Sequence, residues 1–326
     1  MRILFMGTSA FAVPSLTELV KSGKKVVGVV TTPDRPSGRG MEIQGSPVKE
    51  AAAKFGLPVF QPAQAKKETF LKTVEELEVD LIALAAFGQI LPKELLDVPK
   101  YGCVNVHPSL LPRYRGPAPI QWALINGDRE TGVTIIFLNE RMDAGDIVSQ
   151  KVVKIDEEES ADSLSQRLAA LGAGMLDEAI ELIKEGTAPR IPQDDDRSTY
   201  ASPLEKDDGQ IDWSLPAPKI HNLVRGLSPW PGTYTSLGNM PIKVVQTSVF
   251  AEERSEPEMR KRPGKILARV KKAGWLVSTG EGKLLIHRIQ ASGKRVMTVD
   301  EFCNGHNVED GVSFKRSTQL EGRMDA

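Results

Sequence analysis

The feature that most constrains the fold is a near-continuous apolar stretch at residues 79–86, Val-Asp-Leu-Ile-Ala-Leu-Ala-Ala. Because side chains alternate along a strand, a strand that is apolar at successive positions must be covered on both faces, as in parallel sheets flanked by helices. Around this stretch, the first half of the chain alternates short β-branched segments with amphipathic ones. The alternation predicts an α/β fold with a Rossmann-like, doubly wound sheet.

Other elements follow from the same reading of periodicity and turn residues. Strands are expected at residues 2–6, 25–30, 57–60, 102–106 and 131–138, and helices at residues 14–20, 48–55 and 160–186. Residues 188–208 are rich in proline, aspartate and serine and lack periodicity, which is typical of a linker. Beyond them, short strands punctuated by glycines predict a small antiparallel β-barrel.

Composition narrows the class of protein. A chain of 326 residues is expected to form two domains, and 40% hydrophobic with 26% charged residues is typical of a soluble globular protein. Apolar runs stay short of the roughly 20 residues that span a bilayer, and the first residues start a strand rather than a signal peptide. Two cysteines and four histidines without metal-binding spacing argue against a disulfide framework and a zinc site. The cytoplasm is therefore the expected compartment.

The charge is unevenly distributed along the chain. Residues 1–205 carry 23 Lys and Arg against 29 Asp and Glu, a net charge of −6, whereas residues 206–326 carry 19 against 14, a net charge of +5. Residues 260–272 alone hold seven cations. Such a run is either a solvated face or, on a barrel, a track for a nucleic acid.

Three polar residues stand near the ends of two predicted strands: Asn105, His107 and Asp143. Since side chains alternate along a strand, Asn105 and His107 point to the same side. In an open parallel sheet, the strand before Asp143 would deliver it to the same edge. Taken singly, each residue has an ordinary interpretation as a turn former or a satisfied polar group. Their joint placement predicts a catalytic site.

An amide, an imidazole and a carboxylate are suited to acyl transfer. The amide and the imidazole can donate to a developing oxyanion, the imidazole can move a proton, and the carboxylate can orient it. Pro108 and Pro112 bracket the following loop and stiffen it. Cys103 lies inside the apolar strand and is expected to be a core residue rather than a nucleophile. This set indicates acyl transfer without a covalent enzyme intermediate.

Other segments have both an ordinary and a functional interpretation. Residues 33–40 form a mobile loop with two arginines, which is either solvated or a clamp for phosphate. Residues 85–92, Ala-Ala-Phe-Gly-Gln-Ile-Leu-Pro, leave the central strand and are suited to form a slot for a ring. Residues 7–11 lack the second glycine of a dinucleotide-binding motif, which favours an ordinary turn.

Residues 105–116, Asn-Val-His-Pro-Ser-Leu-Leu-Pro-Arg-Tyr-Arg-Gly, and residues 142–147, Met-Asp-Ala-Gly-Asp-Ile, together resemble the 10-formyltetrahydrofolate-dependent formyltransferases. Five further segments of this chain narrow the resemblance to the family members that formylate methionyl-tRNA: residues 33–40, 46–49, 211–213, 229–232 and 289–297. The resemblance extends to about Gly305. It implies a Rossmann-like catalytic domain and a tRNA-binding barrel of oligonucleotide-binding type. The expected divisions are residues 1–188 for the catalytic domain, 189–207 for a linker, 208–310 for the barrel and 311–326 for a tail.

The resemblance also assigns roles by position. Asn105, His107 and Asp143 correspond to the family's catalytic set. The implied folate-binding wall consists of Phe87, Gly88, Gln89, Ile90, Leu91, Ser109, Leu110, Leu111 and Pro112. The implied tRNA contacts are Arg35, Arg39, Lys261, Arg262, Lys271 and Lys272. Family members often carry a lysine pair after Gly-Arg-Gly, whereas residues 41–44 here are Met-Glu-Ile-Gln. Contacts to the acceptor end are therefore expected to depend more on the basic C-terminal strip.

The implied reaction transfers a formyl group from 10-formyltetrahydrofolate, a co-substrate, to the free α-amine of methionyl-initiator-tRNA, for translation initiation. The amine attacks directly, Asn105 and His107 donate to the oxyanion, and Asp143 orients His107 and helps to remove the ammonium proton. No metal is implied, and the protein is expected to be a cytoplasmic monomer.

Three alternatives remain at this point. A nucleotide-linked amino-sugar N-formyltransferase would share the catalytic set but ignore tRNA, and the basic C-terminal half argues against it. A glycinamide-ribonucleotide formyltransferase would leave the second domain unexplained. A folate- or RNA-binding protein without turnover would leave the catalytic set unexplained.

Overall fold

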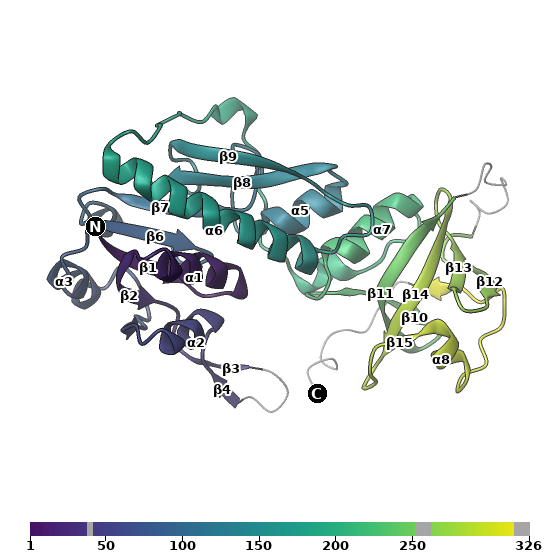
Figure 1. Ribbon diagram of the computed structural model, residues 1–326. Helices are drawn as coiled ribbons and strands as arrows, with labels where there is room; N and C mark the ends of the chain where they lie inside the picture. Colours follow the sequence, from purple (N-terminus) through teal and green to yellow (C-terminus); the bar gives the residue numbers. More distant parts are fainter. Residues whose placement is uncertain (38–41, 252–261, 316–326) are drawn as a thin grey trace. The chain divides into compact units, whose positions relative to one another are not determined.

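The computed structural model describes residues 1–37, 42–251 and 262–315, which separate into two compact units (Figure 1). The first unit comprises Met1–Pro119, Glu130–Lys154 and Leu164–Ser202. The second comprises Ile120–Arg129, Ile155–Ser163 and the described part of Pro203–Ala326. Two stretches from the first half of the chain therefore belong to the second unit, which the sequence pattern does not indicate. The predicted domain divisions stay a prediction.

A seven-stranded sheet in the order β5-β2-β1-β6-β7-β8-β9 forms the centre of the first unit. Neighbouring strands from β5 to β7 pair in parallel, which confirms the Rossmann-like fold class. β6, the apolar stretch at the centre, is buried at every residue because it is covered on both faces. The strands are β1 (Arg2–Gly7), β2 (Lys25–Val30), β5 (Val59–Phe60), β6 (Leu81–Ala85), β7 (Cys103–His107), β8 (Glu130–Phe137) and β9 (Ile147–Lys154).

Helices pack on both faces of this sheet. Figure 1 shows α6 running along one face, where an added Cβ on Gly172 would lie 2.5 Å from Val106. On the other face, Cys103 belongs to a core cluster that includes Phe70 of α3 and Leu95 of α4. Because side chains alternate along β7, Asn105 lies on the face of Cys103, away from α6. The helices of the N-terminal half are α1 (Val13–Lys21), α2 (Pro47–Lys54), α3 (Glu68–Glu76), α4 (Lys93–Leu96), α5 (Pro119–Asn126) and α6 (Ala161–Glu185).

The segment predicted as a mobile loop at residues 33–40 contains a strand. β3 (Arg35–Ser37) pairs antiparallel with β4 (Glu42–Gln44). At its base, Asp34 pairs with Lys49 and accepts a hydrogen bond of 2.7 Å from Gln61. The hydrogen bond from Lys49, followed by that from Gln61, lowers the pKa of the Asp34 carboxyl below its ordinary value. The base of this segment is thus anchored to the first unit.

The second unit is built on an antiparallel sheet in the order β12-β13-β14-β11-β10-β16, with β15 paired to β14. Phe314 N–H donates to the carbonyl of Gly264, and Ile266 N–H donates to that of Val312, each over 2.8 Å. The two edges of the sheet are therefore bound to each other, as in a barrel. The strands are β10 (Thr233–Leu237), β11 (Met240–Phe250), β12 (Ile266–Val270), β13 (Gly274–Ser278), β14 (Lys283–Ala291), β15 (Met297–Thr298) and β16 (Phe314–Lys315).

Aromatic side chains fill the core of the second unit. Trp275 is fully buried and meets the edges of Phe302 and Phe314 at centroid distances of 5.6 and 5.9 Å. Trp213 stacks on Phe314 at 5.2 Å. Burying one large apolar side chain contributes about 1.5–3 kcal/mol to folding. The helices here are α7 (Ala217–Gly226) and α8 (Val299–Cys303).

α7 packs against the stretches that come from the first half of the chain. An added Cβ on Gly226 would lie 2.8 Å from Ile125 of α5. His221 Nε2 lies 3.2 Å from the carbonyl oxygen of Glu157, and Arg225 donates to that of Asp156 over 3.1 Å. These contacts explain why residues 120–129 and 155–163 belong to the second unit.

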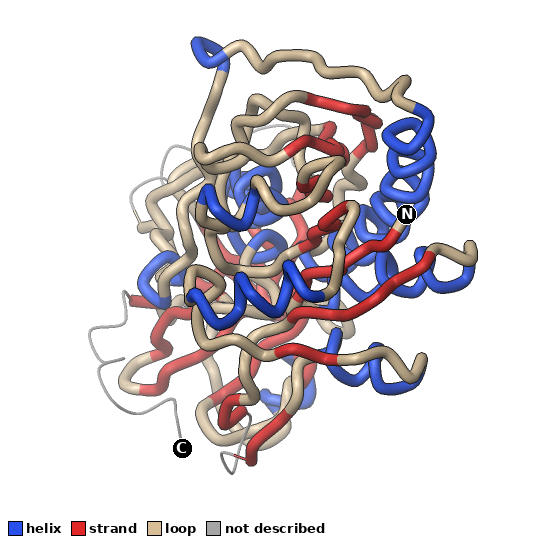
Figure 2. Tube along the Cα trace, turned by 90° about the vertical axis from the view of Figure 1, so that its left-hand side faces the viewer, coloured by secondary structure: helices blue, strands red, loops and turns tan. Residues whose placement is uncertain are grey.

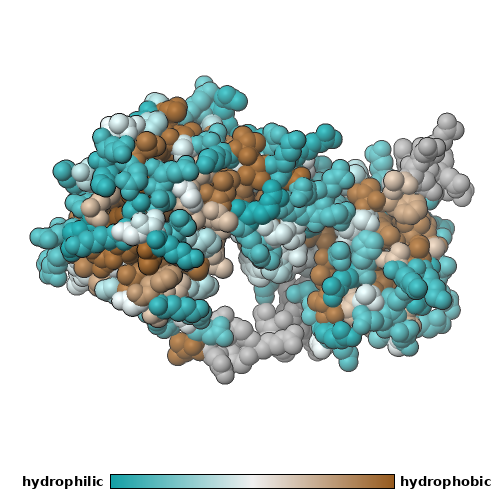
Figure 3. All heavy atoms as spheres, in the orientation of Figure 1, coloured by the Kyte–Doolittle hydropathy of each residue, from teal (hydrophilic) through white to brown (hydrophobic). Residues whose placement is uncertain are grey.

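The surface is mixed in character. Hydrophilic residues predominate on the face drawn in Figure 3. Exposed large hydrophobic residues occur among the described ones and include Ile43, Ile90 and Trp230. Among the described residues, none of the helices combines the length and the apolar character that crossing a membrane requires.

The buried position of Cys103 predicts low thiol reactivity. Burial raises the pKa of the Cys103 thiol to about 12. At about pH 8 the native thiol therefore stays protonated, and only the thiolate reacts with alkylating reagents. We expect iodoacetamide to leave Cys103 unmodified in the native protein and to modify it after unfolding, as measured by peptide mass spectrometry. The less buried Cys303 serves as the internal reference; faster modification of Cys103 than of Cys303 would contradict this account.

Candidate active site

Asn105 and His107 lie at the end of β7, on the same face of the strand. β7 pairs in parallel with β6, with Asn105 opposite Leu84. The His107 side chain is buried, whereas Asn105 is half-buried. Within the part of the chain that the structure describes, the Asn105 amide makes no hydrogen bond. Its N–H groups are therefore available to a ligand.

The partner of His107 defines its tautomer. Nε2 lies 2.9 Å from the carbonyl oxygen of Tyr114. A carbonyl oxygen can only accept a hydrogen bond, so Nε2 carries a hydrogen, and in the neutral ring Nδ1 has the lone pair. Nδ1 faces Asp143, with 3.6 Å between Nδ1 and Oδ1. Proton exchange at His107 must therefore take place through Nδ1, on the side of the carboxylate.

Asp143 reaches His107 by a route that differs from the sequence expectation. We expected the strand before Asp143 to be parallel and to end at the same edge as β7. That expectation was wrong: β8 pairs antiparallel with β7, and Phe137, at the end of β8, lies opposite Val104. Leu138 then packs against the core cluster that contains Cys103. The chain therefore leaves β8 on the face of β7 that carries Asn105 and His107, and returns along it to Asp143.

The local backbone at Asp143 is unusual. Its φ is +50°, in the left-handed region of backbone conformation, which residues other than glycine rarely adopt. Oδ2 of the carboxylate accepts a hydrogen bond of 2.9 Å from the N–H of Gly116. At Gly145, an added Cβ would lie 1.8 Å from the carbonyl oxygen of Phe137, so the turn requires glycine there. The carboxylate is thus held between the Gly116 N–H and the His107 ring.

The loop after β7 is folded by hydrogen bonds from β8 and β9. Thr134 Oγ1 donates to the carbonyl of Ser109 over 2.6 Å and accepts from the N–H of Leu111 over 3.3 Å. Gln150 Nε2 donates to the carbonyl of Leu111 over 3.0 Å and to Thr134 Oγ1 over 2.9 Å. The Ser109 hydroxyl donates to the carbonyl of Arg113 over 2.7 Å. The side chains of Ser109 and Leu111 are buried.

The loop after β6 emerges at the same sheet edge because β6 and β7 are parallel neighbours. Phe87 and Leu91 are buried, and Gln89 Oε1 accepts a hydrogen bond of 2.8 Å from Ala65 N–H. Gly88 and Ile90 are exposed. The other four residues predicted to line a folate site follow β7. Leu110 and Pro112 are half-buried, whereas the side chains of Ser109 and Leu111 are buried.

The predicted tRNA contacts are distributed over both units. Arg35 is exposed on β3 of the first unit. In the second unit, Arg262 precedes β12, and Lys271 and Lys272 form the turn between β12 and β13; all three are exposed. Arg39 and Lys261 lie outside the described residues.

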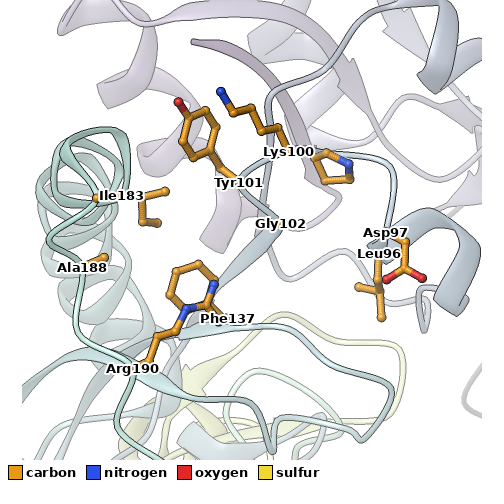
Figure 4. Close-up of a pocket in the computed structure, with 11 residues that line it drawn as sticks. Leu96, Asp97, Lys100, Tyr101, Gly102, Phe137, Ile183, Ala188 and Arg190 are labelled. Atoms are coloured by element: carbon orange, nitrogen blue, oxygen red, sulfur yellow. The ribbon is translucent and has the colours of Figure 1, made fainter.

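A cavity of about 450 Å³ lies at the opposite end of β7 (Figure 4). Gly102, directly before β7, lines it together with Tyr101 and Phe137. The Arg190 guanidinium lies over the Phe137 ring, 3.7 Å from its centroid. Because the cavity opens at the start of β7, it is separate from His107. In the described part of the chain, no three His, Cys, Asp or Glu side chains are grouped as metal ligands would be.

Sequence reasoning missed the residues that hold the site in place. Tyr114 and Gly116 belong to the motif at residues 105–116 but were given no role, and they act through a backbone carbonyl and a backbone N–H. The others lie outside that motif and act through their side chains: Thr134, Gln150, Gln193 and Thr199. Tyr114 has a φ of +59°, and its N–H donates to Thr199 Oγ1 over 2.8 Å. The composition of residues 188–208, which predicted a linker, did not indicate that Gln193 and Thr199 contact the loops around Asp143 and Tyr114.

Comparisons with known proteins cover nearly the whole chain. The family described as "Formyl transferase" matches residues 1–180, and "Formyl transferase, C-terminal domain" matches residues 203–307. A methionyl-tRNA formyltransferase from Desulforamulus reducens is 46% identical over 312 residues, covering 96% of this chain and 97% of its own. One from Acetivibrio thermocellus is 46% identical over 311 residues, covering 95% and 98%.

Solved structures share the fold at low sequence identity. The sugar 3N-formyl transferase WlaRD superposes with a TM-score of 0.66 at 19% identity, covering 90% of this chain and 99% of its own. HypX from Aquifex aeolicus, solved in complex with tetrahydrofolic acid, superposes with a TM-score of 0.65 at 18% identity, covering 97% of this chain and 51% of its own.

The contact between His107 and Tyr114 predicts one ring tautomer. We expect the neutral His107 ring to carry its hydrogen on Nε2, because the Tyr114 carbonyl can only accept. Nitrogen-15 NMR of the ring distinguishes the tautomers, and with four histidines in the chain, a His107→Gln variant assigns the signals. A hydrogen on Nδ1 in the neutral ring would contradict the observed partner.

Thr134 provides a test of how the loop after β7 is stabilised. Thr134→Val keeps the shape of the side chain but removes the hydroxyl. The Ser109 carbonyl, the Leu111 N–H and the Gln150 amide each lose one hydrogen bond. We expect a loss of about 1–3 kcal/mol in the free energy of unfolding, measured with urea. Thr134→Ser keeps the hydroxyl and removes one methyl group, so its loss should be about 1 kcal/mol. A larger loss in the serine variant than in the valine variant would show that the hydrogen bonds are not the source of stability.

Proposed function

This chain belongs to the formyl transferase family, and on that premise we propose that it transfers a formyl group from 10-formyltetrahydrofolate to the α-amine of methionyl-initiator-tRNA. The observation that carries the proposal is the identity of 42–46% with methionyl-tRNA formyltransferases along 97–100% of their length. Both units are included in that likeness. The grouping of Asn105, His107 and Asp143 supports the same reaction.

The chemistry of the transfer requires one proton to move. The attacking amine forms a bond to the formyl carbon and must lose a proton, while N10 of the folate leaves from that carbon and must gain one. In between, the formyl oxygen carries negative charge. The site therefore needs a donor for the oxygen and a group that first accepts and then returns a proton.

The residues of the site match these two requirements. The Asn105 amide has no hydrogen-bond partner among the described residues and is available to donate to the oxyanion. His107 is held through Nε2 by Tyr114, which leaves Nδ1 beside Asp143 for the proton. A protonated Nδ1 can donate to the oxyanion or return the proton to the folate nitrogen. Asp143 stabilises that proton by its negative charge.

The folate donor is proposed to bind at the edge formed by the loops after β6 and β7. Phe87, Leu91, Ser109 and Leu111 are buried and would shape this wall from behind. Ile90 is 70% exposed and would contact the ligand directly. We expect backbone groups next to Gly88 to provide polar contacts, because a glycine lets a ligand approach the main chain.

tRNA is proposed to contact the exposed cations of both units. In the second unit, Arg262, Lys271 and Lys272 provide positive charge on and beside one hairpin of the barrel. Such contacts release counterions from the phosphates, so affinity should fall steeply with salt. A cytoplasmic location and a monomeric state remain part of this proposal.

A second candidate is N-formylation of a nucleotide-linked amino sugar. The fold is shared with sugar formyltransferases, but the identities of 18–19% support the fold alone. The deciding assay supplies 10-formyltetrahydrofolate with either methionyl-initiator-tRNA or a nucleotide-linked amino sugar. Transfer to the tRNA alone, with strong inhibition by salt, is expected. Transfer to the sugar alone would retain the catalytic chemistry and overturn the proposed acceptor.

Asn105→Ala tests the oxyanion donor. Removing one such donor costs about two to three orders of magnitude in kcat in comparable sites, so we expect a loss of that size with folate affinity within about twofold. Single-turnover formylation measures the rate, and fluorescence titration measures folate binding. Asn105→Asp, which matches the size but cannot donate when ionised, should lose as much. Near-normal turnover in either variant would remove Asn105 from the mechanism.

A further inference from the structure

The segment after α6 lies against the loop that carries Asp143 and against the loop that follows β7. Figures 1 and 2 show it as a long loop that leaves the end of α6 and reaches the 3-10 helix η2 (Asp195–Arg197). We call residues 191–201 of this segment the strap. At its start, Ile191 and Ile147 exchange two backbone hydrogen bonds of 2.8 and 3.1 Å. At its end, Ala201 N–H donates to the carbonyl of Arg115 over 2.7 Å. The strap therefore connects the loop of Asp143 with the loop after β7.

Gln193, near the start of the strap, binds the turn at Asp143 directly. Its Nε2 donates to the carbonyl of Asp143 and to that of Gly145, over 2.8 Å in each case. Its Oε1 accepts from Nε and Nη2 of Arg115 over 3.0 and 2.8 Å. Because carbonyls only accept and a guanidinium only donates, the orientation of the Gln193 amide is determined. All four hydrogen bonds require a side chain with both an amide donor and an acceptor.

The turn that Gln193 holds has a strained backbone. Asp143 adopts a φ of +50°, and a residue with a side chain persists in this region only where its surroundings enforce it. One amide group binds the carbonyl of the strained residue and that of Gly145, two residues further along the turn. In this conformation, Oδ2 meets the Gly116 N–H and Oδ1 faces His107 Nδ1. Both contacts of the carboxylate are thus made from this backbone conformation.

The support for Gln193 is itself buried. Arg115 is 9% exposed, and its Nη2 also pairs with Asp195 over 2.8 Å. Asp195 binds Arg141 as well, over 2.7 Å. The hydrogen bond from Arg141, followed by that from Arg115, lowers the pKa of the Asp195 carboxyl below its ordinary value. Arg115 still has two hydrogen bonds to Gln193 when the contact to Asp195 is removed, so the two contacts can be tested separately.

We propose that Gln193 is a positioning residue of formyl transfer, which keeps the Asp143 carboxylate directed at His107. The proposal rests on the proposed function and extends it to a residue that binds the backbone of Asp143 rather than its carboxylate. The amide acts through the backbone of Asp143, so its loss should affect the chemical step rather than the binding of either substrate.

Gln193→Glu is the test, because it keeps the size and the acceptor for Arg115 but offers no N–H to the two carbonyls. We expect kcat for methionyl-tRNA to fall about tenfold to a hundredfold, since small misplacements of catalytic groups have effects of this size. KM for both substrates should stay within about twofold. Equal losses in kcat and in substrate affinity, or an unchanged kcat, would overturn the proposal.

Asp195→Asn is the matched control in the same strap. It removes the charge that pairs with Arg115 and Arg141 but leaves every hydrogen bond of Gln193 in place. We expect its kcat to stay within about threefold of the wild type. A loss as large as that of Gln193→Glu would show that the strap acts as a whole and that Gln193 has no separate role. Should Gln193→Glu fail to fold, Gln193→Met replaces it, since it removes the hydrogen bonds without adding a charge.

A measurement without substrates separates this proposal from the proposed function. Nitrogen-15 chemical shifts of the His107 ring report on the neighbouring carboxylate. We expect Gln193→Glu to change them in the same direction as Asp143→Asn, and Asp195→Asn to leave them unchanged. Wild-type shifts in Gln193→Glu would refute the positioning role even if the enzyme formylated another acceptor. An inactive wild type with the expected shifts would refute the acceptor and not the role of Gln193.

Discussion

The pairing of β7 is the constraint on which the site depends. β7 is bonded in parallel to β6 and antiparallel to β8, and α6 approaches its other face so closely that only glycine fits at residue 172. Val106 is directed at α6, and alternation then places Asn105 and His107 on the opposite face. A shift of one residue in this register would bury Asn105 and His107 under α6 and turn the apolar side chains to the opposite face. The same hydrophobic packing that stabilises the sheet therefore selects which side chains lie on the face of Asn105 and His107.

Around this fixed strand, the groups proposed to be catalytic are oriented by main-chain contacts rather than by other charged side chains. A carbonyl holds His107, a backbone N–H holds Asp143, and the amide of Asn105 has no partner among the described residues. Backbone groups are set by the fold and need no reorganisation when charge develops on the substrate, which is the property that makes such sites effective. The strap contributes to the same arrangement from a distant part of the sequence.

Much of this structure follows from local sequence. The apolar run at residues 79–86 predicted the central strand, and the alternation before and after it predicted the Rossmann-like sheet. Asn105 and His107 could be assigned to one face because the period of a strand is two residues. The direction of β8 could not be predicted, because its pairing with β7 and the packing of Leu138 against the core cluster form only in the folded sheet. Gln193 was invisible for a related reason: a glutamine in a segment without periodicity looks the same whether it is solvated or bound to two carbonyls.

The division of the chain between its two units determines how the protein can be cut into fragments. The chain passes from one unit to the other after residues 119, 129, 154, 163 and 202. A single cut in the segment after α6 would therefore leave α5 and residues 155–163 on the wrong fragment, and α7 would lose the surface on which Gly226 and His221 pack. The halves are not interchangeable modules joined by a tether. Evolution can replace the C-terminal barrel only together with the two inserted stretches, or with others that cover the same helix.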